Sequence, residues 1–297
     1  MPASRLAKTI FASLLILSFA APVIAQGIVD LKKKAAAGDA IAQFNLGAAY
    51  ENGDGVPKDK AEAISWYRKA AEQGNAKAQN NLGRAYDYGV GVPKDKVEAV
   101  RWYRKAADQG DASAQLNLGL MYDHGEGVQK DEVEAARWYH RAADQGIASA
   151  QNNLGWDYDL GVGVPKDPVE AIRWYRKSAD QGHASAQCNL GWAYAHGNGV
   201  PKDAVEAIRL YRMAANQGHS YAQFNLGLAY YYGDGVHQDY AEAYFWLRIS
   251  SLGKLDSSVQ QNAIKAMDLA ASHLTHADIS QAQARAGKWV TEHSTSE

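Results

Sequence analysis

Carboxylates and imidazoles recur along this chain at fixed intervals. Asp87, Asp123 and Asp159 are spaced by 36 residues, and His124 and His196 by twice that interval. Paired carboxylates can hydrolyse glycosidic bonds when about 5–10 Å apart, and a metal needs ligands within bonding distance of one ion. The 36-residue interval puts neighbouring carboxylates one structural layer, roughly 8–10 Å, apart and the histidines two layers apart. We therefore expect no catalytic residue, metal site or cofactor, and interpret the acidic row as a solvated face or an anchor for a basic partner segment.

The interval belongs to a repeat that covers most of the chain. Asn-Leu-Gly begins at Asn45, Asn81, Asn117, Asn153, Asn189 and Asn225. A fixed period of 20–50 residues is typical of a solenoid, in which each unit buries its apolar face by stacking on the next. Such folds usually bind a partner along an extended surface.

One unit, residues 39–74, predicts a helix–loop–helix. Apolar positions at spacings of three and four predict a first helix from about Ala40 to Asn52, which Gly53 ends in a left-handed conformation. Asp59 is the expected N-cap of a second helix, Lys60 to Gln73, with Glu62 completing a capping box. The fold class is therefore all-α.

The glycine of each Asn-Leu-Gly lies inside the first helix, where it costs about 1 kcal/mol relative to alanine. Close approach of the second helix, where a Cβ would clash, is the natural reason to keep it. One position of the second helix carries Trp66, Trp102, Trp138, Trp174, Leu210 and Trp246, an apolar set that predicts a core position. Arg101, Arg137, Arg173 and Arg209 each follow a glutamate by three residues, which predicts ion pairs along the outer face.

The repeat resembles a known family. The matching segments are Ala42-Gln43, Asn45-Leu46-Gly47, Gly53 to Asp59, Trp66 to Ala71 and Gln73-Gly74. They are similar to the Sel-one-like repeat, a 36-residue relative of the tetratricopeptide repeat, and the resemblance covers residues 28 to about 253. It implies a right-handed superhelix of antiparallel helix pairs that serves as an adaptor in protein complexes.

Bacterial members of that family include exported proteins that regulate envelope signalling or contact host proteins. Some exported relatives are cysteine-rich, with a disulfide in each repeat, and a penicillin-related activity has been proposed for them. This chain has one cysteine, Cys188, so that activity is not carried over. A lone cysteine also forbids an intramolecular disulfide, and a small buried apolar side chain is the expected role.

The first 25 residues read as a signal peptide. Arg5 and Lys8 precede an apolar stretch of about 12 residues, and Val23-Ile24-Ala25 forms a small-residue cleavage site. A membrane anchor fits less well because about 20 apolar residues are needed to span a bilayer. We expect cleavage, no membrane span afterwards, and a location in the periplasm or outside the cell.

The sequence predicts a further division of the chain after the signal peptide. Residues 26–38 form a capping half-repeat, residues 39–253 six repeats, and residues 254–297 a C-terminal helical cap and tail. In the last part, Ser257 and Thr275 are expected to open two amphipathic helices. We expect a monomer. The balance of 31 Lys and Arg against 33 Asp and Glu gives no electrostatic case for nucleic acid or an anionic membrane.

Candidate binding residues come from comparing the six copies of the first helix. The positions of Ala42, Gln43, Leu46, Gly47 and Tyr50 are constant, whereas an arc on the opposite side varies. In solenoids of helix pairs this arc lines the concave groove, and large apolar and aromatic residues there favour a protein-binding patch. The candidates are Phe44, Tyr88, Asp87, Leu120, Asp123, Trp156, Asp159, Trp192, Phe224 and Tyr231. The alternative is that a tightly wound groove buries these side chains against each other or against the caps.

The sequence thus predicts an exported, non-enzymatic adaptor that binds a protein or peptide in its groove, in envelope regulation or host interaction. A peptidoglycan- or carbohydrate-associated protein is the alternative, because tryptophan and tyrosine platforms with carboxylates also suit sugars. A weak hydrolase acting on wall material is the third possibility.

Overall fold

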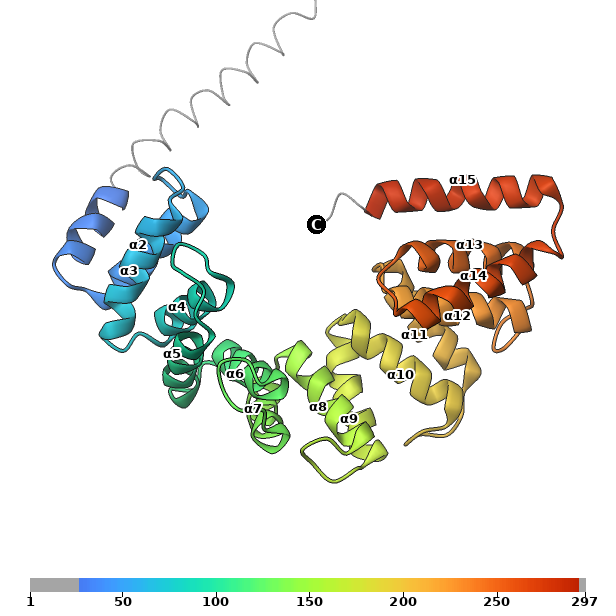
Figure 1. Ribbon diagram of the computed structural model, residues 1–297, viewed down its shortest axis with the longest axis horizontal. Helices are drawn as coiled ribbons and strands as arrows, with labels where there is room; N and C mark the ends of the chain where they lie inside the picture. The colour runs from blue at the N-terminus through green and yellow to red at the C-terminus, as the bar shows by residue number, and fades with distance from the viewer. Residues whose placement is uncertain (1–26, 294–297) are drawn as a thin grey trace, which may run out of the picture. The chain divides into compact units, whose positions relative to one another are not determined.

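The computed structural model describes residues 27–293, and the predicted signal peptide lies outside them. The described residues are helical, with no strand among them (Figure 1). They belong to two compact units, one ending at Trp138 and the other beginning at Tyr139. The boundary falls inside α7 (Glu132–Asp144).

In the first unit, residues 27–36 are helical and precede two complete helix pairs and the first helix of a third. The bounds are α2 (Ala40–Asn52), α3 (Lys60–Glu72), α4 (Ala76–Tyr88), α5 (Lys96–Asp108) and α6 (Ala112–His124). Each of α2 to α5 packs against the helix that follows it in the chain. The predicted bounds of the first repeat hold to within one residue.

The second unit continues the same arrangement and ends in two further helices. The bounds are α8 (Ala148–Leu160), α9 (Pro168–Asp180), α10 (Ala184–His196), α11 (Ala204–Asn216), α12 (Ser220–Tyr232), α13 (Tyr240–Leu252), α14 (Ser257–Ala271) and α15 (His276–His293). Both α14 and α15 pack against α13 (Figure 1). Stacked helix pairs in both units confirm the all-α solenoid class, while the division of the chain into leader, half-repeat, repeats and cap stays a prediction.

The ends of the helices follow from cap chemistry. Gly53 ends α2 with φ of 85°, and the Asp59 carboxylate accepts hydrogen bonds from the backbone N–H groups of Ala61 and Glu62. The predicted capping box at Asp59 is wrong, because its backbone N–H donates to the carbonyl of Tyr50 instead. The loop thus folds back onto the end of α2, and the carbonyl of Tyr50 accepts the hydrogen bond that the Glu62 side chain was predicted to accept.

A reciprocal capping box does occur in the C-terminal part of the chain. The backbone N–H of Thr275 donates to the Asp278 carboxylate, and the backbone N–H of Asp278 donates to the Thr275 hydroxyl. Among the residues that the structure describes, no backbone carbonyl accepts from the Thr275 N–H in the way that the carbonyl of Tyr50 accepts from Asp59. The side chains at the start of α15 therefore satisfy each other.

The glycine inside each first helix marks a close helix contact, as predicted. A Cβ on Gly83 would lie 2.7 Å from Cδ1 of Tyr103, and one on Gly155 would lie 2.7 Å from Cδ1 of Tyr175. Both tyrosines are among the most deeply buried side chains of the described residues. The second helix of each pair thus approaches to a distance that only glycine permits.

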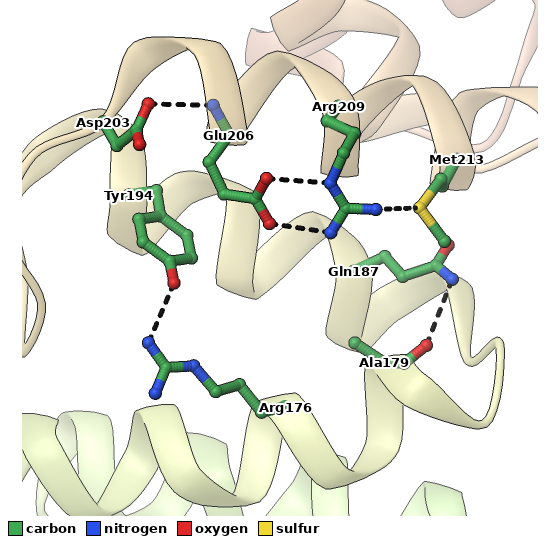
Figure 2. A network of polar contacts seen from close by, with 8 residues as sticks. All are labelled: Arg176, Ala179, Gln187, Tyr194, Asp203, Glu206, Arg209 and Met213. Carbon is green, nitrogen blue, oxygen red and sulfur yellow. Dashed lines mark hydrogen bonds and ion pairs between the residues drawn. The ribbon is translucent and has the colours of Figure 1, made fainter.

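A ladder of glutamines joins successive pairs. The buried Gln187 of α10 donates to the carbonyl of Ala179 at the end of α9 (Figure 2). Its amide oxygen accepts from Gln217 Nε2, which lies at the end of α11. Gln43, Gln79 and Gln151 make the same two kinds of contact. Each glutamine therefore links the helix before it to the end of the helix after it.

The other structural predictions hold as well. Trp102, Trp138, Trp174, Trp246 and Leu210 are buried, and Trp66 is partly buried. The four arginines pair with the glutamates three residues earlier; Arg209 does so through two of its nitrogens (Figure 2). Cys188 is buried, and burial raises the pKa of its thiol to about 12. It is a packed apolar side chain with little thiolate character.

Candidate partner-binding strip

The variable arc divides into two strips that differ in exposure. We call the positions equivalent to residues 48 and 52 the outer strip, and those equivalent to 44 and 51 the inner strip. Tyr88, Trp156 and Trp192 of the outer strip are 69%, 49% and 41% exposed. The residues equivalent to 52 are all exposed: Asn52, Tyr88, His124, Leu160, His196 and Tyr232.

In the second unit the outer strip has an aromatic centre. Trp156 and Leu160 lie one turn apart on α8, and both are about half exposed. On α10, the next first helix, Trp192 stacks on His196 with ring centroids 4.4 Å apart. Leu120, the outer-strip residue of α6 in the first unit, is only partly exposed. Large side chains exposed at positions that the fold leaves free are typical of interaction surfaces.

The inner strip at the position of residue 44 joins neighbouring repeats. Asn117 donates its side-chain amide to Asn80 at 3.0 Å, and Asn189 donates to Asn152 at 3.1 Å. Phe44 is partly buried, with its ring 5.7 Å from that of Tyr67. This position serves the packing of one pair on the next, which the sequence comparison alone did not reveal.

The acidic positions of the inner strip are engaged by the fold. Asp87 is buried, accepts a hydrogen bond from the Tyr103 hydroxyl at 3.2 Å, and forms an ion pair with Lys96. Lys96 also binds Glu126 of the next repeat at 2.7 Å. Although burial alone would lower it, the hydrogen bonds to Asp87 and Glu126 raise the pKa of the Lys96 ammonium. Asp87 thus belongs to a network of ion pairs and hydrogen bonds that joins two successive repeats.

Asp159 has a similar place in the second unit. Its carboxylate accepts a hydrogen bond from Asn198 at 2.6 Å, again from the loop of the next repeat. Burial first, and then the charges of Asp159 and Asp157, raise the pKa of Tyr175, whose buried hydroxyl has no hydrogen-bond partner within residues 27–293. Asp123 is partly exposed. A binding role for the three aspartates stays a prediction, and the structure gives two of them a role within the fold.

Sequence reasoning missed the tyrosine partner of these carboxylates. Tyr67 donates to Glu51 at 2.6 Å, in the same way that Tyr103 donates to Asp87. The signal was present, because a carboxylate precedes a tyrosine by 16 residues in the first four repeats. The fifth and sixth repeats have Ala195 and Tyr231 in place of the carboxylate.

The arc of the last repeat is covered by the C-terminal helices. Phe224, Leu228 and Tyr231 pack into a cluster with Met267 and Ala270 of α14. The rings of Tyr231 and Tyr240 also meet edge to face, 5.6 Å between centroids. The alternative that the caps bury the arc therefore describes Phe224 and Tyr231, whereas Tyr88, Trp156 and Trp192 are exposed.

Comparison with known proteins identifies the repeat. The family model described as Sel1 repeat matches residues 40–75, 76–111, 112–147, 148–183, 184–219 and 220–255. This chain belongs to the Sel1 repeat family. Sel1 repeat proteins are typically protein-interaction scaffolds and typically non-enzymatic. A comparison with curated proteins finds no match.

Solved structures of Sel1 repeat proteins are similar to this chain. A Sel1 repeat protein from Oxalobacter formigenes is 39% identical, with a TM-score of 0.70 over 82% of this chain and 96% of that one. A protective antigen present in uropathogenic Escherichia coli strains, displaying an SLR fold, is 29% identical, with a TM-score of 0.48 over 91% of this chain and 80% of that one.

Residues 27–293 contain no cluster of three or more His, Cys, Asp or Glu side chains arranged to hold a metal ion. Within the same residues, every helix is too short or too polar to cross a bilayer.

Proposed function

We propose that this Sel1 repeat protein is an exported, non-enzymatic adaptor that binds a protein or peptide through the outer strip of its first helices. The expected anchors are Trp156 and Trp192 in the second unit, and Tyr88 and Leu120 in the first unit. Aromatic side chains of this size dominate the binding energy of most protein interfaces. The partner would serve envelope regulation or contact with a host.

One observation carries the proposal, the contrast between the last repeat and the repeats before it. On α12, Leu228 occupies the position equivalent to Trp156 and Trp192, and it packs together with Phe224 and Tyr231 against Met267 and Ala270 of the amphipathic α14. On α8 and α10 the tryptophans at equivalent places are exposed. The chain therefore shows how an amphipathic helix can cover such an arc. We expect an apolar helical or extended segment of a partner to cover Trp156 and Trp192 in the same way.

Export rests on the predicted signal peptide, residues 1–25. The mass of the protein purified from the envelope fraction, or from the culture medium, would show whether it begins at Gln26. Recovery of the uncleaved chain from the cytoplasmic fraction would contradict this part of the proposal.

Photo-crosslinking tests the strip directly. A photoreactive residue would replace Trp156 or Trp192, and envelope extracts would be irradiated with the purified protein. We expect a discrete crosslinked partner, and a Trp156→Ala/Trp192→Ala variant should recover at least tenfold less of it. Val169 and Val205, which are exposed on α9 and α11, provide the matched control positions.

Equal recovery by the tryptophan double variant and a Val169→Ala/Val205→Ala variant would contradict the assignment of the strip. The carbohydrate alternative has a separate readout. Binding to purified cell wall in the absence of any other protein, lost in the tryptophan variant, would favour a wall-associated function. Hydrolysis of that wall by pure protein, abolished by Asp123→Asn, would favour an enzyme.

A further inference from the structure

The glutamine ladder ends abruptly at the last repeat. The end of α11 supplies Gln217, whose Nε2 donates to Gln187 Oε1 at 2.8 Å, and Gln73, Gln109 and Gln181 do the same in their repeats. At the end of α13 the equivalent residue is Gly253. Gln223 therefore receives no hydrogen bond of this kind.

The missing donor cannot be restored at position 253. A Cβ on Gly253 would lie 2.1 Å from the hydroxyl oxygen of Ser220 and 2.9 Å from its Cβ. The backbone of Gly253 is also extended, with ψ of −175°, whereas ψ of Gln217 is 4°. Because of the Ser220 contact and the extended backbone, the end of α13 supplies no glutamine side chain to Gln223.

Gln223 is nonetheless a buried side chain, only 1% exposed. Its Nε2 donates to the carbonyl of Ala215 at 3.1 Å, as in the other repeats. Its amide oxygen accepts no hydrogen bond from any residue that the structure describes. The oxygen is not among the fully buried side-chain atoms without a partner, so a donor that enters from outside the chain can reach it.

A pocket of about 960 Å³ lies where the ladder ends, within the second unit. Gln223 and Gln217 line it together with the apolar side chains of Ile249, Leu252 and Trp289. Pockets that bind small ligands usually measure roughly 300–1,000 Å³ and combine apolar walls with a few polar groups. The pocket is therefore large enough for a short peptide segment, with one polar group at a defined place.

We infer that this pocket binds a peptide through a primary carboxamide, the side chain of a glutamine or asparagine in a partner. The carboxamide N–H donates to Gln223 Oε1 and takes the place that Gln217 fills in the preceding repeat. Ile249, Leu252 and Trp289 contact the aliphatic stem and the neighbouring apolar residues of the peptide. The site shares no residue with the outer strip, so it stands independently of the proposed function.

A carboxylate side chain fits the same place poorly. It has no donor for Gln223 Oε1 and brings two acceptor oxygens toward an acceptor. Lys254 lies in the lining of the pocket and could attract a carboxylate from there. Glutamine and glutamate peptides of the same shape therefore separate recognition by Gln223 from simple attraction to Lys254.

The test uses the full-length chain and two synthetic peptides, acetyl-Leu-Gln-Leu-N-methylamide and acetyl-Leu-Glu-Leu-N-methylamide. Calorimetry would measure binding, and NMR would follow the side-chain NH₂ resonances of Gln223. We expect the glutamine peptide to bind at least tenfold more tightly than the glutamate peptide, because only the carboxamide can donate a hydrogen bond to Gln223 Oε1. It should also shift the Gln223 resonances in the wild-type protein.

Gln223→Met should weaken binding of the glutamine peptide at least tenfold. Gln79→Met is the matched control, since it breaks the ladder in the first unit and should leave peptide binding within twofold of wild type. If Gln223→Met does not fold, Leu252→Asp, at an exposed position of the pocket wall, should still weaken binding at least fivefold. Trp156→Ala/Trp192→Ala should leave it unchanged.

Equal binding of the two peptides, or binding that leaves the Gln223 resonances unshifted, would overturn the inference. So would the absence of binding by the glutamine peptide.

Discussion

The two units cap equivalent helices with different chemistry. In the first unit, α2, α4 and α6 begin at Asp39, Asn75 and Asp111, whose side-chain oxygens accept from backbone N–H groups. In the second unit, α8 begins at Ile147 without a side-chain hydrogen bond. There α10 and α12 begin at His183 and His219, whose Nδ1 atoms accept from Ala186 and Ala222.

The difference shows that one backbone geometry tolerates several caps that respond differently to pH. An imidazole nitrogen accepts a hydrogen bond only when it carries no proton. Burial lowers the pKa of His183, and burial together with the charge of His183 lowers that of His219. The caps of α10 and α12 therefore depend on neutral histidine, whereas those of α2, α4 and α6 use a carboxylate or an amide.

The largest expected loss of stability comes from replacing the glycines inside the first helices, and it should be similar in the two units. Gly83→Leu and Gly155→Leu would each force a side chain against a buried tyrosine, Tyr103 or Tyr175. We expect each to lower the free energy of unfolding by about 3 kcal/mol or more. Urea unfolding followed by circular dichroism would measure it. A small effect in one unit and a large one in the other would mean that the helix pairs are not packed alike.

A smaller change in stability, from removing a tyrosine hydroxyl, should differ between the two units. Tyr103→Phe removes a hydrogen bond to the buried Asp87 and should cost about 2 kcal/mol. Tyr175→Phe removes a buried hydroxyl that has no hydrogen-bond partner among the described residues, and it should be neutral or slightly stabilising. Urea midpoints of the two variants provide the comparison. A clear loss of stability in Tyr175→Phe would show that its hydroxyl is hydrogen-bonded in solution.

The smallest effect concerns pH. Because folding lowers the pKa of His183 and His219, the unfolded chain takes up protons first as the pH falls below about 6.5. The two histidine caps contribute fully to stability above that pH. This contribution is lost as the pH falls through the lowered pKa values of the folded state. We expect a loss of about 1 kcal/mol per cap. Hydrogen exchange at matched intrinsic rates should show it in α10 and α12.

Exchanging the caps provides the control. His183→Asn/His219→Asn should remove most of the acid-dependent loss in α10 and α12, since an amide does not titrate. Asn75→His should introduce a corresponding loss at α4 in the first unit. If the double variant keeps the wild-type pH profile, groups other than these histidines determine the acid response of the second unit.

Much of the fold could be predicted from the sequence because it is local and repeated. The bounds of α2, the left-handed Gly53 and the N-cap at Asp59 each depend on a few adjacent residues. The capping box at Asp59 could not be predicted, because the carbonyl of Tyr50 competes for the same N–H. The exposure of the arc could not be predicted either, because Leu228 and Trp156 occupy equivalent variable positions and only Leu228 packs in the cluster with α14.

The sequence by itself determined the helix pairs, their order and the glycines at which they meet, because the same local pattern occurs six times. Only the tertiary structure decided which repeated side chains are available. It buries Asp87 beside Tyr103 and Lys96, covers Tyr231 with the C-terminal helices, and leaves Gln223 facing a pocket. Each of these outcomes depends on contacts between residues distant in the chain, whose packing no single repeat can encode.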